Sequence, residues 1–316
     1  MIKFGVMGAG NIATKFSKAL LGIGGNLYAI ASRDLNKSEA FKKTYGFEKA
    51  YGSYEDMLKD SSVECVYIAT PHGLHFEHMM LALKYHKHIL CEKAFTLNEE
   101  QAKIVFDEAN NKNLFVMEAL WTRYLPTIIE VKQLISNGVI GDITKIEANF
   151  CFKATRDDES RLFAPHLGGG ALLDVGIYPL TFANLFLGTP HRIESNVDLY
   201  HTGVDLSNEI TLYYDQAIAH LKSSLGYNLP IEGFIYGTKG YIQIPMFIGA
   251  ERASIYDNHH HLIKEIENKH IVNGMEYEIL EVINCLENDR KESSLMTHLE
   301  TLNILHQMDE IRKQWR

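Results

Sequence analysis

The 316-residue sequence predicts an α/β protein with two domains: a doubly wound parallel sheet over residues 1–120, and an α+β domain with an open, mostly antiparallel sheet over residues 121–316. Two patterns carry this prediction. Up to residue 120, short apolar strands alternate with helical segments, which is typical of a parallel sheet. Beyond residue 140, strand-like segments follow one another with few helices between them, as in antiparallel sheets. Helical patterns over residues 279–286 and 299–311 are expected to return to the first domain.

The first element is an apolar strand followed by a glycine turn. Gly8 to Ala13 read G-x-G-x-x-A at the start of a helical pattern. Gly8 permits a tight turn, Gly10 leaves room for a pyrophosphate, and Ala13 is small enough for close packing of helix on strand. The backbone N–H groups where the helix starts, at Asn11 and Ile12, and the helix dipole favour an anion there. The segment therefore predicts a Rossmann dinucleotide-binding domain.

The end of the second strand, residues 27–31, indicates which dinucleotide is bound. An NAD enzyme tends to place an acidic residue there for the ribose hydroxyls, whereas an NADP enzyme offers a small residue and a nearby arginine. Ser32 and Arg33 fit the second pattern, and Lys37 on the following helix adds positive charge for a 2′-phosphate. The alternative is that Arg33 is a solvated surface charge and Asp34 binds the ribose. The pattern favours NADP over NAD.

A second loop lies at the carboxyl end of the strand over residues 63–69, the edge where doubly wound sheets bind ligands. Thr70, Pro71 and His75 are placed there and are candidate cofactor contacts. His72 and His75 raise the question of a metal, but no cysteine or carboxylate stands at ligand spacing from them. We therefore expect the two histidines to shape the loop and cap the next helix, and we predict no metal site.

The fifth strand ends in Cys91-Glu92-Lys93-Ala94, and Lys93 is the first candidate for chemistry. An ammonium at this edge can orient a substrate hydroxyl and lower the pKa of a neighbouring phenol or imidazole. Glu92 beside it is a candidate cofactor contact. The alternative is that Lys93 is a surface lysine paired with Glu92.

In the second half, the segment 168–179 reads GGGALLDVGIYP. Its three glycines permit a backbone that passes close to a ligand, and Pro179 suits the first turn of a helix. Tyr178 can exchange a proton with an alcohol or ketone if a cation lowers its pKa, and Asp174 can fix the substrate or a partner side chain. The alternative is that Asp174 caps a helix and Tyr178 is a core residue.

Bulk properties exclude several partners. The net charge is −9 and no basic run is present, which argues against nucleic acid. The four cysteines are scattered without a C-x-x-C pair, as is typical of reduced thiols in the cytoplasm. The N-terminus reads as a strand rather than a signal peptide, and no apolar run is expected to be as long as a membrane span. We therefore expect a cytoplasmic protein that binds neither membrane nor nucleic acid.

With these segments in this order, the sequence resembles the glucose-fructose oxidoreductase/inositol dehydrogenase/MocA family over essentially its full length. In that family an E-K-P strand end supplies a catalytic lysine, and a later D-x-x-x-H supplies an aspartate and an acid/base histidine. This chain departs from the pattern twice: Ala94 replaces the proline, whose peptide bond is commonly cis, and Tyr178 replaces the histidine. The tyrosine, together with the segments 91–94 and 118–126, resembles the dimeric dihydrodiol dehydrogenase branch.

The resemblance implies a fold, a cofactor and an assembly. It implies a Rossmann domain followed by an open antiparallel sheet through which members commonly form dimers or tetramers. It further implies NADP as the cofactor, Tyr178 as the acid/base, and activity on trans-dihydrodiols and aldopyranoses such as D-xylose. Trp121 and Arg123, from the W-x-R segment, are carried over as residues near the cofactor.

The sequence thus leads to one preferred function and two alternatives. The preferred function is NADP-dependent hydride transfer at a secondary alcohol of a sugar or cyclic trans-diol, with Tyr178 as acid/base assisted by Lys93 and Asp174. One alternative is an NAD-linked sugar or inositol dehydrogenase of the same fold. The other is a catalytically silent, cofactor-sensing regulatory protein, because a fold alone does not define a function.

Overall fold

The computed structural model describes residues 1–315, and the chain divides into two compact units. The first unit combines Met1–Leu120 with His270–Leu302, and the second combines Trp121–Lys269 with the chain from Asn303 onward. The boundary after residue 120 coincides with the change in sequence pattern. Residues 270–302 belong to the first unit although the predicted second domain runs from residue 121 to residue 316; they contain the helix 279–286 that the sequence expected to return to the first domain.

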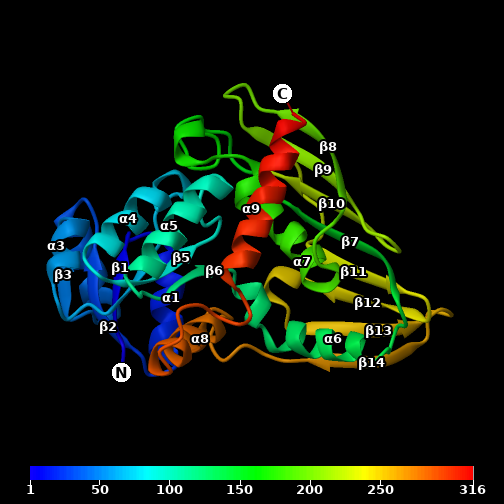
Figure 1. Cartoon of the computed structure of the whole chain (residues 1–316), viewed down its shortest axis with the longest axis horizontal. Helices are drawn as coiled ribbons and strands as arrows, with labels where there is room; N and C mark the ends of the chain where they lie inside the picture. The colour runs from blue at the N-terminus through cyan, green and yellow to red at the C-terminus, as the bar shows by residue number, and fades with distance from the viewer. Residues whose placement is uncertain (316) are drawn as a thin grey trace. The chain divides into compact units, whose positions relative to one another are not determined.

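The first unit contains a six-stranded parallel sheet in the order β3-β2-β1-β4-β5-β6 (Figure 1). Its strands are β1 (Lys3–Met7), β2 (Asn26–Ala31), β3 (Lys49–Tyr51), β4 (Cys65–Ile68), β5 (His88–Glu92) and β6 (Val116–Ala119). Its helices are α1 (Asn11–Gly22), α2 (Leu35–Tyr45), α3 (Tyr54–Lys59), α4 (His75–Lys84), α5 (Glu99–Asn111) and α8 (Glu276–Glu287). The predicted doubly wound sheet is thereby confirmed.

The strand order places helices on both faces of this sheet. The chain moves from β1 to β3 in one direction and from β4 to β6 in the other, so right-handed crossovers put the two sets of helices on opposite faces. Helix α4 contacts α5, while α8 contacts α1. Because both faces are covered, the central strands β1 and β4 are almost entirely buried and mostly apolar.

The second unit contains an eight-stranded sheet in the order β14-β13-β12-β11-β7-β10-β9-β8. All neighbours are antiparallel except β7 and β10, which are parallel. The strands are β7 (Ile143–Cys151), β8 (Arg192–Leu199), β9 (Asp205–Tyr213), β10 (Ile218–Ser224), β11 (Glu232–Gly237), β12 (Gly240–Pro245), β13 (Arg252–Asp257) and β14 (Leu262–Glu267). The prediction of an open, mostly antiparallel sheet is confirmed.

Two strands of this sheet were missed by the sequence reading. They are β13 and β14, which flank the turn at residues 259–261. β14 is an edge strand in which Ile266 is the one buried residue, so its sequence lacks the apolar face that identifies a strand.

One face of the sheet packs on α7 (Ile177–Leu187), whose first seven residues are all buried. The stretch Pro165–Leu187 is long and apolar enough to span a membrane by length and composition, which corrects the expectation that no such run exists. Most of it, 72% of its apolar window, is buried inside the unit. Its composition is that of a core helix surrounded by protein.

The remaining helices are α6 (Pro126–Ser136) and α9 (His298–Lys313).

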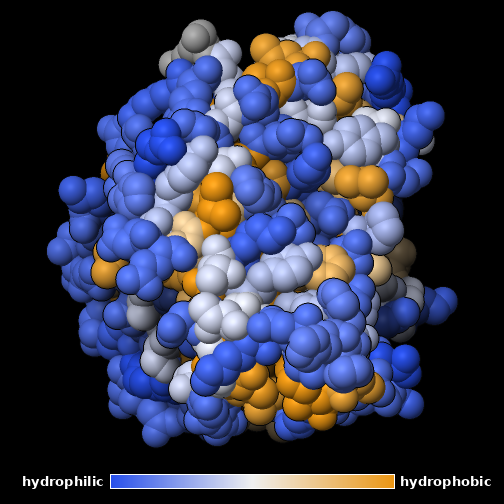
Figure 2. All heavy atoms as spheres, turned by 90° about the vertical axis from the view of Figure 1, so that its right-hand side faces the viewer, coloured by the Kyte–Doolittle hydropathy of each residue, from blue (hydrophilic) through white to orange (hydrophobic). Residues whose placement is uncertain are grey.

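The other face of the sheet is its outer face and carries mixed side chains. Alternation along the strands directs Phe234, Tyr236, Tyr241 and Tyr256 to this side. Their rings form a continuous row, with successive centroids 5.9, 5.8 and 4.9 Å apart. Figure 2, which views the molecule from the side of these strands, shows hydrophilic residues interspersed with paler and apolar ones.

Candidate active site

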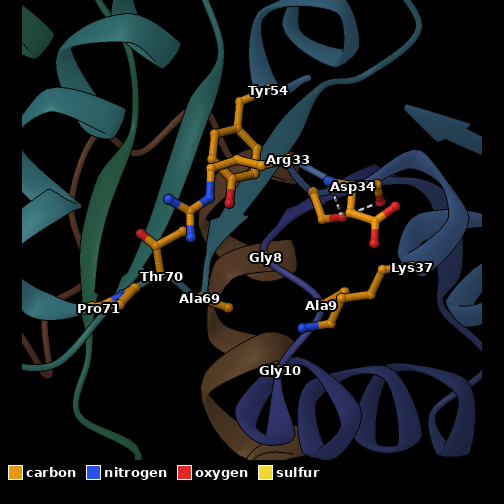
Figure 3. A pocket seen from close by; sticks show the side chains of 11 residues that line it. Gly8, Ala9, Gly10, Arg33, Asp34, Lys37, Tyr54, Ala69, Thr70 and Pro71 are labelled. Carbon is orange, nitrogen blue, oxygen red and sulfur yellow. Dashed lines mark hydrogen bonds between the residues drawn. The ribbon is translucent and has the colours of Figure 1, made fainter. Parts of the chain in front are cut away.

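The first unit has a pocket of about 360 Å³ at the carboxyl ends of β1, β2 and β4 (Figure 3). Its position is the one that doubly wound sheets use for ligands. It brings together the glycine turn, the end of β2 and the loop after β4, as the sequence predicted. The lining residues are Gly8, Ala9, Gly10, Ser32, Arg33, Asp34, Lys37, Tyr54, Ala69, Thr70 and Pro71.

The two glycines of the turn serve different purposes. Gly8 has φ +104°, and a Cβ there would lie 2.9 Å from the carbonyl oxygen of Ala69, so the fold itself requires glycine. Gly10 has φ −106°, and a Cβ would meet no atom within 4 Å. Gly10 is also the N-cap of α1, and no side chain caps the helix. The empty space beside an uncapped helix N-terminus fits a dinucleotide phosphate.

The cations at the end of β2 line the same pocket. Figure 3 shows the Arg33 guanidinium pointing toward Thr70 and the Lys37 side chain extending toward Ala9 and Gly10. Asp34, the alternative ribose ligand, accepts a hydrogen bond from Asn36 N at 2.9 Å and so caps α2. One of its oxygens is therefore engaged within the chain, which favours the NADP interpretation.

Ser32 is a small residue that shapes the turn. Its hydroxyl donates to the carbonyl oxygen of Asp34 at 2.6 Å and accepts from Ser38 Oγ at 3.0 Å. The side chain is buried, with 6% exposure. We infer that Ser32 makes room for a ligand between Arg33 and Lys37 rather than binding it with its hydroxyl.

Tyr54, at the start of α3, was missed by the sequence reading. Its ring lies edge-on to the His78 ring at 4.8 Å, and Thr70 Oγ1 lies 2.9 Å from His78 Nδ1. Burial lowers the pKa of the His78 imidazole to about 4, and Arg33 adds to this effect, so the ring is neutral at pH 7. The signal in the sequence was Ser53 as a helix cap, which places the next side chain beside the end of β2.

His75 holds two loops together. It is fully buried, and its ring nitrogens lie 2.7 Å from the carbonyl oxygen of Thr70 and 2.9 Å from that of Ala94. Burial lowers the pKa of its imidazole to about 4. The residue was predicted as a cofactor contact, but the structure gives it a position behind the pocket, between the ends of β4 and β5. The expectation that it shapes the loop describes it better.

The Lys93 loop is anchored by a buried glutamate. Glu118 accepts hydrogen bonds from Phe95 N and from Thr301 Oγ1, both at 3.0 Å. The peptide bond between Lys93 and Ala94 is cis, although alanine stands where the family pattern has proline. Glu92, on the preceding position, accepts a hydrogen bond from the Tyr67 hydroxyl and is 8% exposed. The strand end that carries Lys93 is thus held from both sides.

In the second unit, Tyr178 lies at the start of α7. Its hydroxyl oxygen accepts a hydrogen bond from Trp121 Nε1 at 3.3 Å, and its ring lies 5.7 Å from that of Phe150. The W-x-R segment predicted to lie near the cofactor therefore contacts the candidate acid/base through Trp121. Arg123, in the same short 3₁₀ helix, is 7% exposed.

Asp174 precedes Tyr178 by one turn, in a π-helical segment over Leu172–Gly176. Gly176, between them, lies against β10, where a Cβ would be 2.8 Å from Ser223 Oγ. Side chains two residues to either side of Gly176 point away from β10, so Asp174 and Tyr178 share one face. Asp174 Oδ1 accepts from Arg161 Nη1 at 2.7 Å.

The glycines of the GGG segment accommodate the chain itself, which corrects the expectation that they face a ligand. A Cβ on Gly169 would lie 2.8 Å from the carbonyl oxygen of Leu162, and one on Gly170 would lie 2.2 Å from Asp205 Oδ1. Gly170 N donates to the same Leu162 carbonyl at 2.9 Å. The glycines thus let the loop before them pack directly on the segment that leads to Asp174.

Asp205 holds the start of the π-helical segment Leu172–Gly176 through hydrogen bonds. Its Oδ2 accepts from Leu172 N at 2.7 Å and from Asn208 Nδ2 at 2.8 Å. Burial raises the pKa of its carboxyl to about 7, against the hydrogen bonds from Leu172 and Asn208, which favour the ionised form. Among residues 1–315, no group of three histidine, cysteine or acidic side chains lies close enough together to hold a metal ion.

Fold and pocket together define a class: an oxidoreductase with a Rossmann unit and a second unit built on an open, mostly antiparallel sheet. The family described as "Oxidoreductase family, NAD-binding Rossmann fold" matches residues 2–120, and the "GFO/IDH/MocA C-terminal domain" matches residues 128–243. The chain belongs to this glucose-fructose oxidoreductase/inositol dehydrogenase/MocA family of oxidoreductases, which confirms the resemblance noted from the sequence.

Named relatives lie within the predicted branch. The chain is 34% identical to trans-1,2-dihydrobenzene-1,2-diol dehydrogenase of Xenopus tropicalis, over 99% of this chain and 97% of the relative. It is 31% identical to D-xylose 1-dehydrogenase (NADP(+)) of Hypocrea jecorina, over 99% and 92%. These relatives are dehydrogenases that act on diol or sugar hydroxyls, as their names state.

Solved structures share the fold. A 3-ketoreductase from Actinomadura kijaniata, in complex with NADP and TDP-benzene, superposes with a TM-score of 0.88 at 23% identity, over 99% of this chain and 97% of the other. Levoglucosan dehydrogenase, in complex with NADH and levoglucosan, superposes with a TM-score of 0.88 at 18% identity, over 99% and 96%. At these identities the likeness concerns the arrangement of the chain.

The contrast between the two glycines generates a prediction. Gly10→Ser should leave the thermal unfolding midpoint within about 1 °C of the wild type, because the new side chain enters open space and serine is a good N-cap. It should raise the dissociation constant for NADPH more than about 10-fold, because the side chain occupies the phosphate position. Differential scanning fluorimetry and fluorescence titration measure the two effects. Gly8→Ala, the matched variant, should lower the midpoint; equal stability losses in both variants would contradict the assignment.

The buried Asp205 generates a second prediction. The pKa of the Asp205 carboxyl is higher in the folded state than in the unfolded state. Between about pH 4 and about pH 7 the unfolded chain therefore loses this proton more readily, and the contribution of Asp205 to the free energy of unfolding falls as the pH rises. Above about pH 7 the contribution is constant. Asp205→Asn removes this dependence. The free energy of unfolding of the variant relative to wild type should therefore increase over this range, by up to about 4 kcal/mol. Urea titrations at several pH values measure it, with the exposed Asp215→Asn as control. A constant difference would refute the raised pKa.

Proposed function

We propose that the protein is an NADP-dependent dehydrogenase that transfers a hydride between the cofactor and a secondary alcohol of a sugar or cyclic trans-diol. The observation that carries the proposal is the environment of Tyr178. Its hydroxyl oxygen accepts a hydrogen bond from the Trp121 indole N–H, on the face of the helical segment that also presents Asp174. A phenol with this surrounding, in a member of a dehydrogenase family, is suited to exchange a proton with an alcohol.

The choice of NADP rests on the pocket of the first unit. Arg33 and Lys37 both line it, Ser32 is small, and the Asp34 carboxylate caps α2. Two cations suit the additional phosphate of NADP, whereas NAD would call for a carboxylate accepting from the ribose. The name of the relative from Hypocrea jecorina includes NADP(+).

Three side chains are assigned to the reaction. NADP, when bound, supplies the hydride acceptor for the oxidation of the alcohol carbon. As the C–H bond breaks, Tyr178 Oη removes the hydroxyl proton and a carbonyl forms; in the reverse direction the same oxygen returns the proton. A hydrogen bond from Trp121 favours the phenolate form of Tyr178 over the phenol. Lys93 is assigned the role of the cation that further favours this form.

Asp174 is assigned to substrate orientation rather than proton transfer. Its carboxylate is paired with Arg161 at 2.7 Å, and a neighbouring guanidinium favours the ionised, acceptor-only state. A carboxylate in this state can accept from a substrate hydroxyl and fix the ring of a sugar or diol next to Tyr178.

We further propose that two copies of the chain associate through the outer face of the larger sheet. The row of aromatic rings from Phe234 to Tyr256 supplies apolar area on β11, β12 and β13 of that face. Association would remove this area from water, as in many homo-oligomers. We also propose a cytoplasmic location, because all four cysteines are unpaired and buried.

The assignment of Tyr178 is tested by removing one oxygen atom. Wild-type protein should reduce NADP in the presence of a trans-diol or D-xylose, as followed by absorbance of the reduced nicotinamide. Tyr178→Phe should lower kcat about 10²- to 10⁴-fold with little change in NADPH affinity, because only a proton-transfer contact is lost. Tyr213→Phe, on the exposed side of β9, is the control. A parallel loss of NADPH affinity would make Tyr178 structural, and binding without turnover of any sugar or diol would favour a sensor.

The choice of cofactor is tested at Arg33. Arg33→Ala should weaken NADPH binding about 10- to 100-fold, because a charge-assisted contact to the 2′-phosphate is lost. NADH binding should change less than about 3-fold, since NADH lacks that phosphate. Lys43→Ala, on the exposed side of α2, controls for a general loss of positive charge. If the ratio of the two affinities does not move, the NADP assignment is wrong.

A further inference from the structure

Arg161 is a charged residue of the second unit that enters the proposed reaction only as the partner that favours the ionised form of Asp174. It lies in the loop between β7 and the GGG segment, and its guanidinium forms a salt bridge with Asp174 at 2.7 Å. The two partners differ in exposure: 54% of the Arg161 side chain is accessible, against 7% of the Asp174 side chain. The pair therefore has one end enclosed by protein and one end that an approaching molecule can contact.

The backbone next to Arg161 is held by contacts of the two residues that follow it. The next residue, Leu162, presents its carbonyl oxygen to Gly170 N at 2.9 Å. Phe163 is buried in a cluster with Ala171 and Val175, and its carbonyl oxygen accepts from Thr202 Oγ1 at 2.7 Å. Since the backbone on one side of Arg161 is held in this way, the guanidinium is brought to Asp174 before any ligand binds.

The pair offers a donor and an acceptor side by side. A guanidinium has five N–H donors and no acceptor, while an ionised carboxylate only accepts. Two hydroxyls on adjacent ring carbons, when gauche, have oxygens within hydrogen-bond distance of each other. One hydroxyl of such a pair can donate to the carboxylate and accept from the guanidinium, while the other remains available to give its proton to Tyr178. A substrate with a single hydroxyl cannot do both, because its one proton goes to Tyr178.

The charge of the pair selects against ions. Arg161 and Asp174 together carry no net charge, so a neutral polyol can bind without leaving either charge unbalanced. A substrate carboxylate or phosphate that contacted Arg161 would compete with Asp174 for the guanidinium and leave the buried carboxylate without its partner, which is unfavourable. The chemistry therefore favours a neutral substrate.

We propose that Arg161 is a specificity-determining residue that, with Asp174, recognises the vicinal hydroxyl pair of a neutral cyclic substrate. The hydroxyl next to the reacting one donates to Asp174 and accepts from Arg161, while the reacting hydroxyl gives its proton to Tyr178. This inference rests on the proposed dehydrogenase function and adds to it the residue that binds the second hydroxyl, on the carbon next to the oxidised one.

The test compares substrates with and without the second hydroxyl. Initial rates with NADP are measured for trans-cyclohexane-1,2-diol and cyclohexanol, in wild type and Arg161→Met. Loss of a hydrogen bond from a charged donor should lower kcat/KM for the diol about 10- to 100-fold, mainly through KM. For cyclohexanol the change should be less than about 3-fold. Where cyclohexanol turns over too slowly, its inhibition constant against the diol supplies the comparison.

Two further variants separate recognition from folding. Arg156→Met removes an exposed arginine of the same loop, whose guanidinium lies 5.7 Å from the Tyr200 ring centre, and should leave both substrates unaffected. Arg161→Lys retains the positive charge but lacks the planar guanidinium with its several N–H donors. Compared with Arg161→Met, it should recover part of the preference for the diol.

The outcomes discriminate between the inference and the function on which it rests. Equal losses on the diol and on cyclohexanol would show that Arg161 only positions Asp174, and no loss on either would show that it makes no contact; both results overturn the inference and leave the dehydrogenase function standing. If wild-type protein turns over no sugar or diol with NADP, the proposed function itself fails and the inference fails with it.

Discussion

The close approach of Leu162 to Gly169 and Gly170 is the constraint on which the site of the second unit depends. The carbonyl oxygen of Leu162 lies where a Cβ on Gly169 would be, and the same oxygen accepts from Gly170 N. This contact joins the loop after β7 to the segment before α7 and so brings Arg161 to Asp174. Asp205 completes the arrangement by accepting from Leu172 N. Burial of this carboxyl costs free energy, and the hydrogen bonds that it accepts from Leu172 N and Asn208 Nδ2 offset part of that cost.

In the first unit, two different glycines serve close packing of the chain and space for a ligand. Gly8 is required by the close approach of the turn to Ala69, whereas nothing in the chain fills the space beside Gly10. Behind the pocket, His75 and Glu118 hold the loops at the ends of β4 and β5 through backbone contacts to Ala94 and Phe95. The polar residues buried in this region therefore set the conformation of the strand end that carries Lys93. Such supporting contacts explain why a binding edge built from loops can remain rigid.

Much of the fold and part of the site could be predicted from the sequence. The alternation of strands and helices, the G-x-G-x-x-A turn and the shift to strand-rich patterning identified both sheets, because these signals are local. β14 was not predicted because an exposed edge strand lacks an apolar face. Arg161 and Tyr54 were not predicted as site residues because each reaches its position through contacts with residues distant in sequence. The GGG segment was misjudged for the same reason: a glycine that accommodates another part of the chain and one that accommodates a ligand look alike in sequence.

The discontinuity of the first unit has a consequence for how the protein is made. Helix α8 packs on α1, and Asn273 Nδ2 donates to the carbonyl oxygen of Lys15 at 2.9 Å, so residues near both ends of the chain share one structural unit. During synthesis, the six strands of the parallel sheet leave the ribosome long before the helix that covers one of their faces. The face of the nascent Rossmann sheet that α8 covers in the finished protein therefore stays exposed while some 150 residues of the second unit are translated. The order of translation thus makes the completion of the cofactor-binding unit a late event in the maturation of the chain.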